Sequence, residues 1–101
     1  MVVVRDVFRL KFGQSKEAVA LWREAAAALR NSGFGAINIR LLTDFVGPSY
    51  YTVILESTFN SVGEWEKAHA AGKDNAPWKA LYAKIIPYSE AGHREILSVL
   101  E

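Results

Sequence analysis

The sequence VVVRDVFRLKF, residues 2–12, alternates between apolar and polar side chains. One parity carries four apolar residues, Val4, Phe8, Leu10 and Phe12. The other parity carries three basic residues, Arg5, Arg9 and Lys11. A period of two is typical of a β-strand with one buried face and one polar face. We therefore predict a strand over residues 2–12 that ends at Gly13.

The chain beyond this strand divides into segments of helical and of strand periodicity. Helical patterns cover residues 16–31, residues 62–71 and a third segment that ends at Pro87. Alternating or β-branched runs predict strands over residues 35–43, 50–58 and 93–100. The order β-α-β-β-α-α-β is that of the split βαβ, or ferredoxin-like, arrangement. We predict an α+β fold in which helices cover one face of an antiparallel sheet, as a single domain over residues 1–101.

Local signals mark where these elements begin and turn. The expected helix N-caps are Ser15, Ser61 in a capping box with Glu64, and either Asp74 or Asn75. The first helix carries one apolar stripe, formed by Ala18, Leu21, Trp22, Ala25 and Leu29. Gly47-Pro48 is typical of a turn, so the strands on either side of it are expected to pair as a hairpin.

Composition excludes several classes of function. The chain has no cysteine, which excludes disulfides and thiolate chemistry, and its two histidines are far apart, so we expect no metal site. The net charge of +1 gives no strong field, so nucleic acid and membranes are not expected partners. No glycine-rich phosphate loop or nucleophile elbow is present. We expect a cytoplasmic protein, since the apolar run at the start is too short for a signal peptide.

The two faces of the predicted sheet differ in character. The face expected under the helices joins the apolar parity of the first strand to Ile37, Ile39, Leu41, Tyr51, Val53 and Leu55. The other face mixes charged residues such as Arg40 and Glu56 with Val3, Val7, Leu42, Tyr50 and Ile54. Either this second face contacts water, or it packs against an identical sheet. We favour a homodimer, because it would bury the apolar residues and let Arg and Glu pair across a two-fold axis.

Asp6 interrupts the apolar parity of the first strand. It is the one charged residue expected on the sheet face that the helix over residues 62–71 covers. A carboxylate there needs hydrogen-bond donors or a polar cavity, because an unpaired buried charge is costly. Asp6 is therefore either a structural residue with donors or a catalytic carboxylate in a pocket.

His69 follows Trp65 by four residues, so the two share one face of a helix. His69 is either a packed histidine or an acid–base residue. In the second reading it pairs with Asp6 and takes a proton from an enolisable or phenolic substrate held between Trp65 and Tyr51. Trp22 and Trp78 are further candidates for stacking on an aromatic ligand, although core packing is the better explanation for most of the aromatic residues.

The segments APWKALYAKIIPY, residues 76–88, and REILSVL, residues 94–100, together with the element order, resemble the NIPSNAP-like branch of the dimeric α/β-barrel superfamily. In that branch a tryptophan opens a late helix, a proline ends it and the last strand closes the sheet. Trp78, Pro87 and the strand from His93 match this pattern. The resemblance implies a homodimeric α/β barrel. Superfamily members include cofactor-free monooxygenases, haem-degrading enzymes, muconolactone-isomerase-like enzymes and proteins without known activity.

The haem-degrading relatives provide a minor alternative. Their site combines an asparagine on the first strand, a tryptophan and a ligating histidine. Asp6 stands near the place of that asparagine but is an aspartate. His69 comes directly after Trp65, whereas the motif places its histidine well after the tryptophan. The match is partial, and we expect no cofactor.

These observations give two hypotheses for function. The first is a small-molecule-binding protein or cofactor-independent enzyme, monooxygenase-like, acting on a small aromatic or polyketide-like compound in a pocket between helices and sheet. The second is a non-catalytic dimerisation or ligand-sensing module. A partly polar cavity touching both Asp6 and His69 would favour the first. His93 is a further interface candidate whose face is not determined, because Gly92 beside it permits a bulge.

Overall fold

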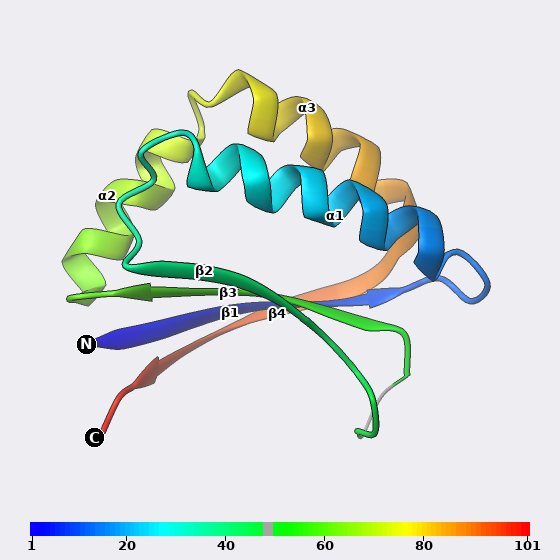
Figure 1. Ribbon diagram of the computed structural model, residues 1–101, viewed down its shortest axis with the longest axis horizontal. Helices are drawn as coiled ribbons and strands as arrows, with labels where there is room; N and C mark the ends of the chain where they lie inside the picture. The colour runs from blue at the N-terminus through cyan, green and yellow to red at the C-terminus, as the bar shows by residue number, and fades with distance from the viewer. Residues whose placement is uncertain (48–49) are drawn as a thin grey trace.

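The chain folds into an antiparallel sheet with helices on one face (Figure 1). This computed structural model describes residues 1–47 and 50–101. The strands are β1 (Val2–Leu10), β2 (Asn38–Thr43), β3 (Thr52–Phe59) and β4 (Ser89–Ser98). The helices are α1 (Ser15–Arg30), α2 (Val62–Gly72) and α3 (Ala76–Ile85), followed by the short 3-10 helix η1 (Ile86–Tyr88). The predicted α+β, ferredoxin-like order is confirmed.

The strand order in the sheet is β2-β3-β1-β4, and every neighbouring pair is antiparallel. The consecutive strands β1 and β2 are therefore separated by β3, and α1 connects them across the sheet. The consecutive strands β3 and β4 are separated by β1, with α2 and α3 between them in the chain. This interleaving is the split βαβ topology. It brings the N-terminal strand into direct contact with the C-terminal strand.

Side-chain caps decide where two of the helices begin. Ser61 caps α2, because its hydroxyl accepts a hydrogen bond of 3.2 Å from the backbone N–H of Glu64. Asn75, rather than Asp74, caps α3, and its side-chain oxygen accepts from the N–H of Trp78 at 3.0 Å. The expected cap at Ser15 was wrong, since this residue already belongs to α1 and no side chain caps that helix.

The predicted strands were too long at four ends, including the last residues of β4, which ends at Ser98, and too short at two, the end of β3 at Phe59 and the start of β4. β1 stops at Leu10, so Phe12 is exposed, and β2 starts after the exposed Ile37. β3 starts after Tyr51, whose backbone φ of +58° leaves the extended region. β4 begins at Ser89, four residues before His93. The turn expected at Gly47-Pro48 lies partly outside the described residues.

Two apolar clusters hold the helices on the sheet. The main cluster joins Trp22 and Leu29 of α1 and Ile85 of α3 to sheet residues of the predicted inner face, including Leu10, Ile39, Val53 and Leu55. Trp22 has no exposed surface, as its place on the predicted α1 stripe requires. A second cluster under α2 consists of Val2, Val4, Phe59 and Ala68. Between them the inner face carries the polar residues described below.

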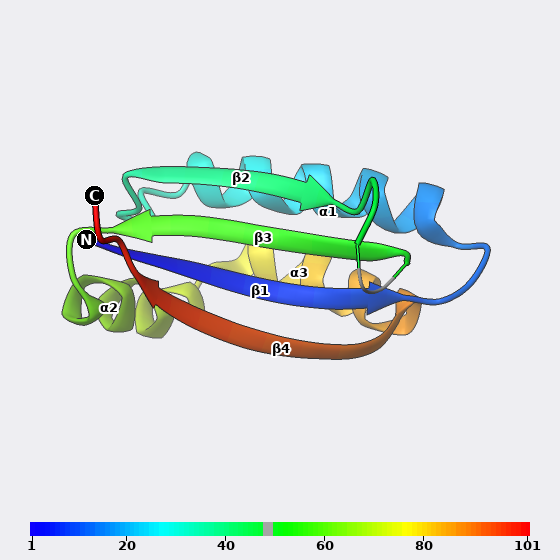
Figure 2. The same cartoon turned by 90° about the horizontal axis from the view of Figure 1, so that it is seen from below.

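No helix covers the opposite face of the sheet, which we call the open face (Figure 2). Strand register places Leu42, Ile54, Val7 and His93 in one row across the open face. The next row is Arg40, Glu56, Arg5 and Glu95. His93 thus shares a face with Val7, and the register shift of β4 falls between the partners of Arg9 and Leu10 rather than at Gly92. Gly92 has another role: a Cβ there would meet the Phe8 ring at 3.0 Å.

Within the described residues, none of the helices has both the length and the hydropathy needed to cross a bilayer.

Candidate functional site

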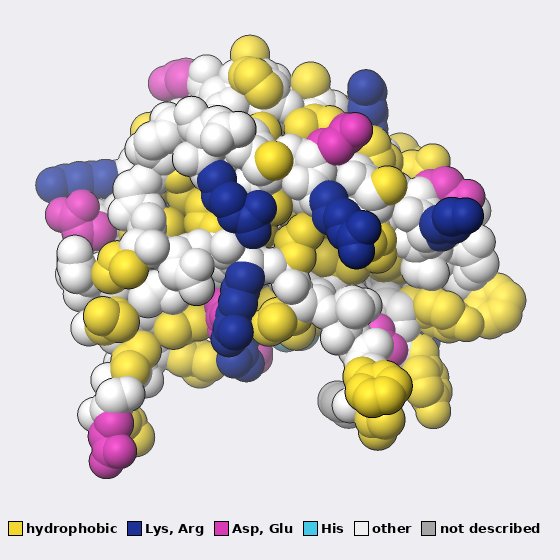
Figure 3. Space-filling model, in the orientation of Figure 1, with side chains coloured by type: hydrophobic (Ala, Val, Ile, Leu, Met, Phe, Trp, Pro, Cys, Tyr) yellow, Lys and Arg dark blue, Asp and Glu magenta, His cyan; other side chains and the backbone are white. Residues whose placement is uncertain are grey.

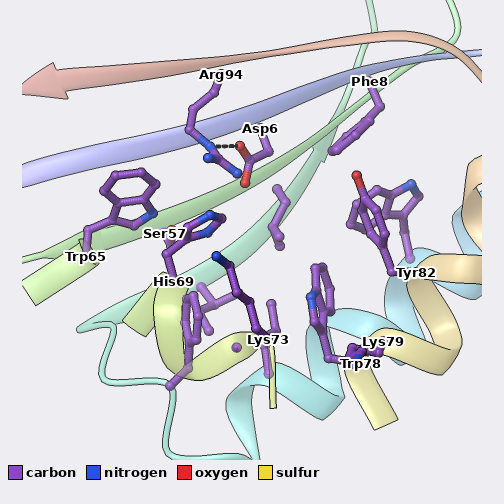
Figure 4. Close-up of a pocket in the computed structure, with 16 residues that line it drawn as sticks. Asp6, Phe8, Ser57, Trp65, His69, Lys73, Trp78, Lys79, Tyr82 and Arg94 are labelled. Carbon is purple, nitrogen blue, oxygen red and sulfur yellow. Dashed lines mark hydrogen bonds and ion pairs between the residues drawn. The ribbon is translucent and has the colours of Figure 1, made fainter. Parts of the chain in front are cut away.

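A cavity of about 450 Å³ lies between the helices and the inner face of the sheet. Its walls come from all three α-helices and from strands β1 to β4, so it exists only once the sheet and helix layers are assembled. Asp6 and His69 both line it. In the close-up, Phe8, Trp78 and Tyr82 lie toward one end of the cavity, which we call the aromatic end, and Trp65, His69, Lys73 and Arg94 lie toward the other, which we call the basic end (Figure 4).

The aromatic end is formed by Phe8, Trp22, Trp78 and Tyr82. The ring centroids of Phe8 and Trp22 are 4.8 Å apart, and those of Trp78 and Tyr82 are 5.5 Å apart. Trp78 and Tyr82 are four residues apart on α3, which places both on the side that faces Trp22 of α1. The buried indole N–H of Trp22 has no hydrogen-bond partner within the described residues.

The basic end is formed around Trp65 on α2. The His69 imidazole stacks on the Trp65 indole, with a centroid distance of 5.1 Å and an interplanar angle of 24°. The Arg94 guanidinium carbon also lies 5.1 Å from the Trp65 ring centroid, a cation–π contact. Lys73 follows His69 by four residues and caps α2 at its C-terminus, so its ammonium group reaches the same end (Figure 4).

Asp6 is held by Arg94 and not by His69. The two residues are direct partners across β1 and β4, and Arg94 Nε donates to Asp6 Oδ1 at 2.5 Å. The expectation that Asp6 is the one charged residue on this face was wrong, because Arg94 shares it. The described residues contain no hydrogen bond between Asp6 and His69. In Figure 4 the guanidinium lies between the Asp6 carboxylate and the Trp65 ring.

His69 lines the cavity and is also exposed to solvent, so it lies at the cavity's opening. Val62, seven residues before His69 on α2, is also exposed, and Ala68 is the residue of α2 that is buried. A base at the opening can exchange its proton with bulk water, which a turnover cycle requires. Its role as a base stays a prediction.

The four aromatic candidates separate into two groups. Trp22, Trp65 and Trp78 line the cavity, and their role in ligand binding stays a prediction. Tyr51 does not line it, so the expected wall of Trp65 and Tyr51 was wrong. Tyr51 packs edge-on against Phe12, with ring centroids 5.4 Å apart, beyond the end of β1. Its backbone leaves the extended conformation just before β3, with φ at +58°, so the alternation of faces along β3 does not extend to Tyr51.

The sequence analysis missed several lining residues, among them Phe8 and Tyr82 as cavity walls, Lys73 and Lys79 as cations, and Arg94 as the partner of Asp6. Phe8 was assigned only to the apolar face of the first strand, and nothing in the spacing of the aromatic residues marks a cavity. Arg94 could have been found from its alternation with Ile96, which faces the helices opposite Val4. That parity was left open because of Gly92.

A separate ionic cluster lies on the open face, away from the cavity. Glu56 is buried there and accepts hydrogen bonds from Arg40 Nε and, at 3.1 Å, from Arg5 Nε. The hydrogen bond from Arg40 lowers the pKa of Glu56 most, Arg5 lowers it further, and burial opposes both. These ion pairs form within one chain, so Arg and Glu do not need a second copy to pair.

The residues of the cavity do not match a metal site or the haem arrangement. In the described part of the chain, no three His, Cys, Asp or Glu side chains are placed to hold a metal ion. A haem-ligating histidine must present one ring nitrogen to the iron. His69, the cavity's histidine, instead lies flat on Trp65, and the carboxylate in place of the asparagine is tied to Arg94. We therefore derive no step through haem.

No protein-family model matches the sequence, and no curated protein sequence matches it significantly. Solved structures do resemble it. A NIPSNAP domain protein from Burkholderia xenovorans superposes with a TM-score of 0.84 at 18% identity, covering 98% of this chain and 94% of the other. A NIPSNAP family protein from Agrobacterium tumefaciens gives 0.81 at 20% identity, covering 96% and 90%.

A third structure comes from Nitrosomonas europaea and is assigned as an antibiotic biosynthesis monooxygenase. It superposes with a TM-score of 0.77 at 16% identity over the full length of both chains. At these identities the likeness establishes the fold. The resemblance drawn from the sequence is thus confirmed at that level: the chain has the ferredoxin-like fold that NIPSNAP domain proteins share with antibiotic biosynthesis monooxygenase-like proteins.

Proposed function

We propose that this protein binds a small aromatic molecule in the cavity between the helices and the sheet. The observation that carries the proposal is the cavity itself, which touches both Asp6 and His69. Its volume of about 450 Å³ falls within the roughly 300–1,000 Å³ of small-molecule sites. A non-catalytic dimerisation module would have no use for a cavity in place of a filled core.

The proposal that the ligand is aromatic rests on the side chains that line the cavity. Rings of Trp22, Trp78 and Tyr82 contact one another along one side of the cavity, and a planar ligand can extend this cluster by stacking or edge-on contacts. Most of the polar side chains lie toward the other end, with Lys79 beside Trp78 as the exception, as in sites where a small number of polar groups orient an apolar ligand.

Protein-observed NMR with a set of bicyclic aromatic compounds tests this proposal. Binding should shift the indole N–H signals of Trp22, Trp65 and Trp78 together. Ser57→Leu should abolish these shifts while circular dichroism stays that of the wild type, because Ser57 lines the cavity and a larger side chain would occupy it. Shifts that persist in Ser57→Leu, or shifts at surface residues alone, would contradict binding in the cavity.

A cofactor-independent, monooxygenase-like enzyme is the more specific form of this proposal, and the position of His69 favours it. The imidazole lies at the cavity's opening next to two cations, Lys73 and Arg94. Proton transfer from a phenolic O–H to an imidazole nitrogen would leave a phenolate oxygen, whose charge the cations can stabilise. The name given to the Nitrosomonas europaea structure agrees with such chemistry. If His69 takes no proton, the same cavity serves a ligand-sensing role.

A second copy of this chain is the partner we propose for the open face. Its apolar row, Leu42, Ile54 and Val7, is not covered by any helix. The adjacent row alternates in charge, from Arg40 through Glu56 and Arg5 to Glu95. In a homodimer, a two-fold axis that lies between the two sheets and runs along the strands would reverse the order of this row in the second copy. Every cation of one copy would then face an anion of the other. A homodimer through these faces would bury the apolar row.

A cytoplasmic location stays a prediction of the sequence.

A further inference from the structure

We infer that the ligand of the cavity is a planar aromatic acid whose anionic group binds between Lys73 and Arg94. The inference rests on the proposed function and adds the charge and the orientation of the ligand. Two independent observations carry it: the charge balance of the cavity wall and the separation of that wall into an aromatic end and a basic end.

The charge balance favours an anion. Three cationic side chains line the cavity, Lys73, Lys79 and Arg94, against one carboxylate, Asp6. Asp6 is already neutralised by its hydrogen bond from Arg94 Nε, so it cannot offset the two lysines as well. All three cationic side chains are exposed at the rim of the cavity, so solvent screens part of their charge, and an anion held beside the apolar walls can still pair with them where a neutral ligand cannot.

The donors at the basic end are available to a ligand. Arg94 uses its Nε for Asp6, and its Nη atoms donate no hydrogen bond within the described residues. A guanidinium has five N–H donors in a fork that matches a carboxylate, so Asp6 can orient Arg94 while the outer donors bind the ligand. Lys73 forms no ion pair within the described part of the chain. Two cations of different shape thus line the same end of the cavity, on either side of His69 in the close-up (Figure 4).

The geometry separates the two ends. In Figure 4, Trp65, His69, Lys73 and Arg94 are drawn on one side of the cavity, and Phe8, Trp78 and Tyr82 on the other. Lys79 lies beside Trp78, away from the group formed by Lys73 and Arg94 (Figure 4). An aromatic acid matches both ends at once, with its ring among the tryptophans and its acid group toward α2 and β4.

Calorimetric titration with 2-naphthoate and 2-naphthamide at pH 7.5 tests the inference. The two probes share one ring system and nearly one shape, but only the first carries a charge. We expect the Kd of naphthoate to be lower by about tenfold or more, the factor associated with one hydrogen bond to a charged group. Lys73→Gln should reduce this preference several-fold. Lys67→Gln removes the same charge from the outward side of α2 and should retain it, because Lys67 does not line the cavity.

The outcomes separate this inference from the proposed function. Equal Kd values for the acid and the amide would overturn the inference and leave an aromatic site in place. No binding of either probe, alongside unshifted indole signals in the NMR experiment, would overturn both. A preference that survives unchanged in Lys73→Gln would overturn the assignment of Lys73 to the anion position.

Discussion

Arg94 and Asp6 stand directly opposite each other on β4 and β1, joined by a 2.5 Å hydrogen bond on the helix-covered face of the sheet. The same guanidinium contacts the Trp65 ring. The pair therefore links the sheet to α2 at the basic end of the cavity, and several other residues depend on it for their environment. The surface view shows lysine and arginine side chains spread singly over this face of the molecule (Figure 3).

A double-mutant cycle should detect the coupling of this pair. Arg94→Gln leaves the largely buried Asp6 carboxylate without its charged donor, and Asp6→Asn leaves the guanidinium without its acceptor. We expect a coupling free energy of about 1 kcal/mol from urea unfolding of the two single variants and the double variant. Additive effects, with a coupling below roughly 0.3 kcal/mol, would mean that the pair does not hold the cavity wall.

The loss of folding stability at acidic pH should arise in part from Glu56. Its pKa is lower in the folded protein than the ordinary value of 4.5, chiefly because Arg40 donates a hydrogen bond to it. A lowered folded pKa stabilises the protein above the unfolded pKa, and this contribution is lost as the pH falls through the folded value. Urea midpoints measured from pH 7 to pH 3 at constant protein concentration should therefore fall less steeply below about pH 4.5 in Glu56→Gln than in the wild type.

Arg40→Gln tests whether the hydrogen bond from Arg40 is what lowers the pKa of Glu56. It removes the hydrogen bond with the largest effect on the pKa of Glu56 and leaves that of Arg5. The acid-dependent loss of stability should become smaller than in the wild type without vanishing. An acid dependence identical to that of the wild type in both variants would contradict the assignment.

The two tryptophans of the aromatic end should differ in their contribution to stability. Trp22 is completely buried, so Trp22→Ala should lower the free energy of unfolding by about 3–5 kcal/mol. Trp78 is half-buried and borders the cavity, so Trp78→Ala should cost less, about 1–2 kcal/mol. If Trp22→Ala does not fold, Trp22→Phe should still lose more stability than Trp78→Phe. Equal losses would mean that the aromatic end is packed uniformly and not open.

The open face should mediate self-association. Sedimentation equilibrium at micromolar concentration should give twice the chain mass of 11.2 kDa. Ile54→Glu should give the monomer mass, because it places a charge in the centre of the apolar row. Ala27→Glu adds the same charge to the exposed side of α1 and should leave the dimer intact. A wild-type mass of 11.2 kDa would place the open face in water.

His69 should act as a proton acceptor toward a phenol bound in the cavity. Bound 4-nitrophenol ionises with a change in visible absorption, so its ionisation can be titrated directly. His69→Gln should shift the midpoint of that titration to higher pH by removing the base beside the hydroxyl, while circular dichroism stays unchanged. His93→Gln, which alters the histidine paired with Val7 across the open face, is the control. A midpoint that His69→Gln leaves in place would make His69 a packing partner of Trp65.

Much of the fold could be predicted from local pattern, and part of the site could not. Alternation in residues 2–12 assigned Val4, Phe8 and Leu10 to the inner face correctly, because each side of a strand repeats every second residue. The ends of the strands were less predictable: β4 starts at Ser89 because the N–H of Lys11 bonds to the carbonyl of Tyr88, a contact between distant segments. Candidate residues Asp6 and His69 reach the same cavity, but their direct pairing was not observed.

The sequence by itself determined the element order, the helix-covered face and the anomaly of a carboxylate on it, since periodicity and capping are local properties. Only the tertiary structure decided what Asp6 pairs with, that Tyr51 lies outside the cavity, and that Lys73 and Arg94 line one end of it. Those outcomes depend on cross-strand register and on where α2 sits over β4. Register and helix placement are set by the packing of the whole core, and a spacing along one segment contains no information about the segment opposite it.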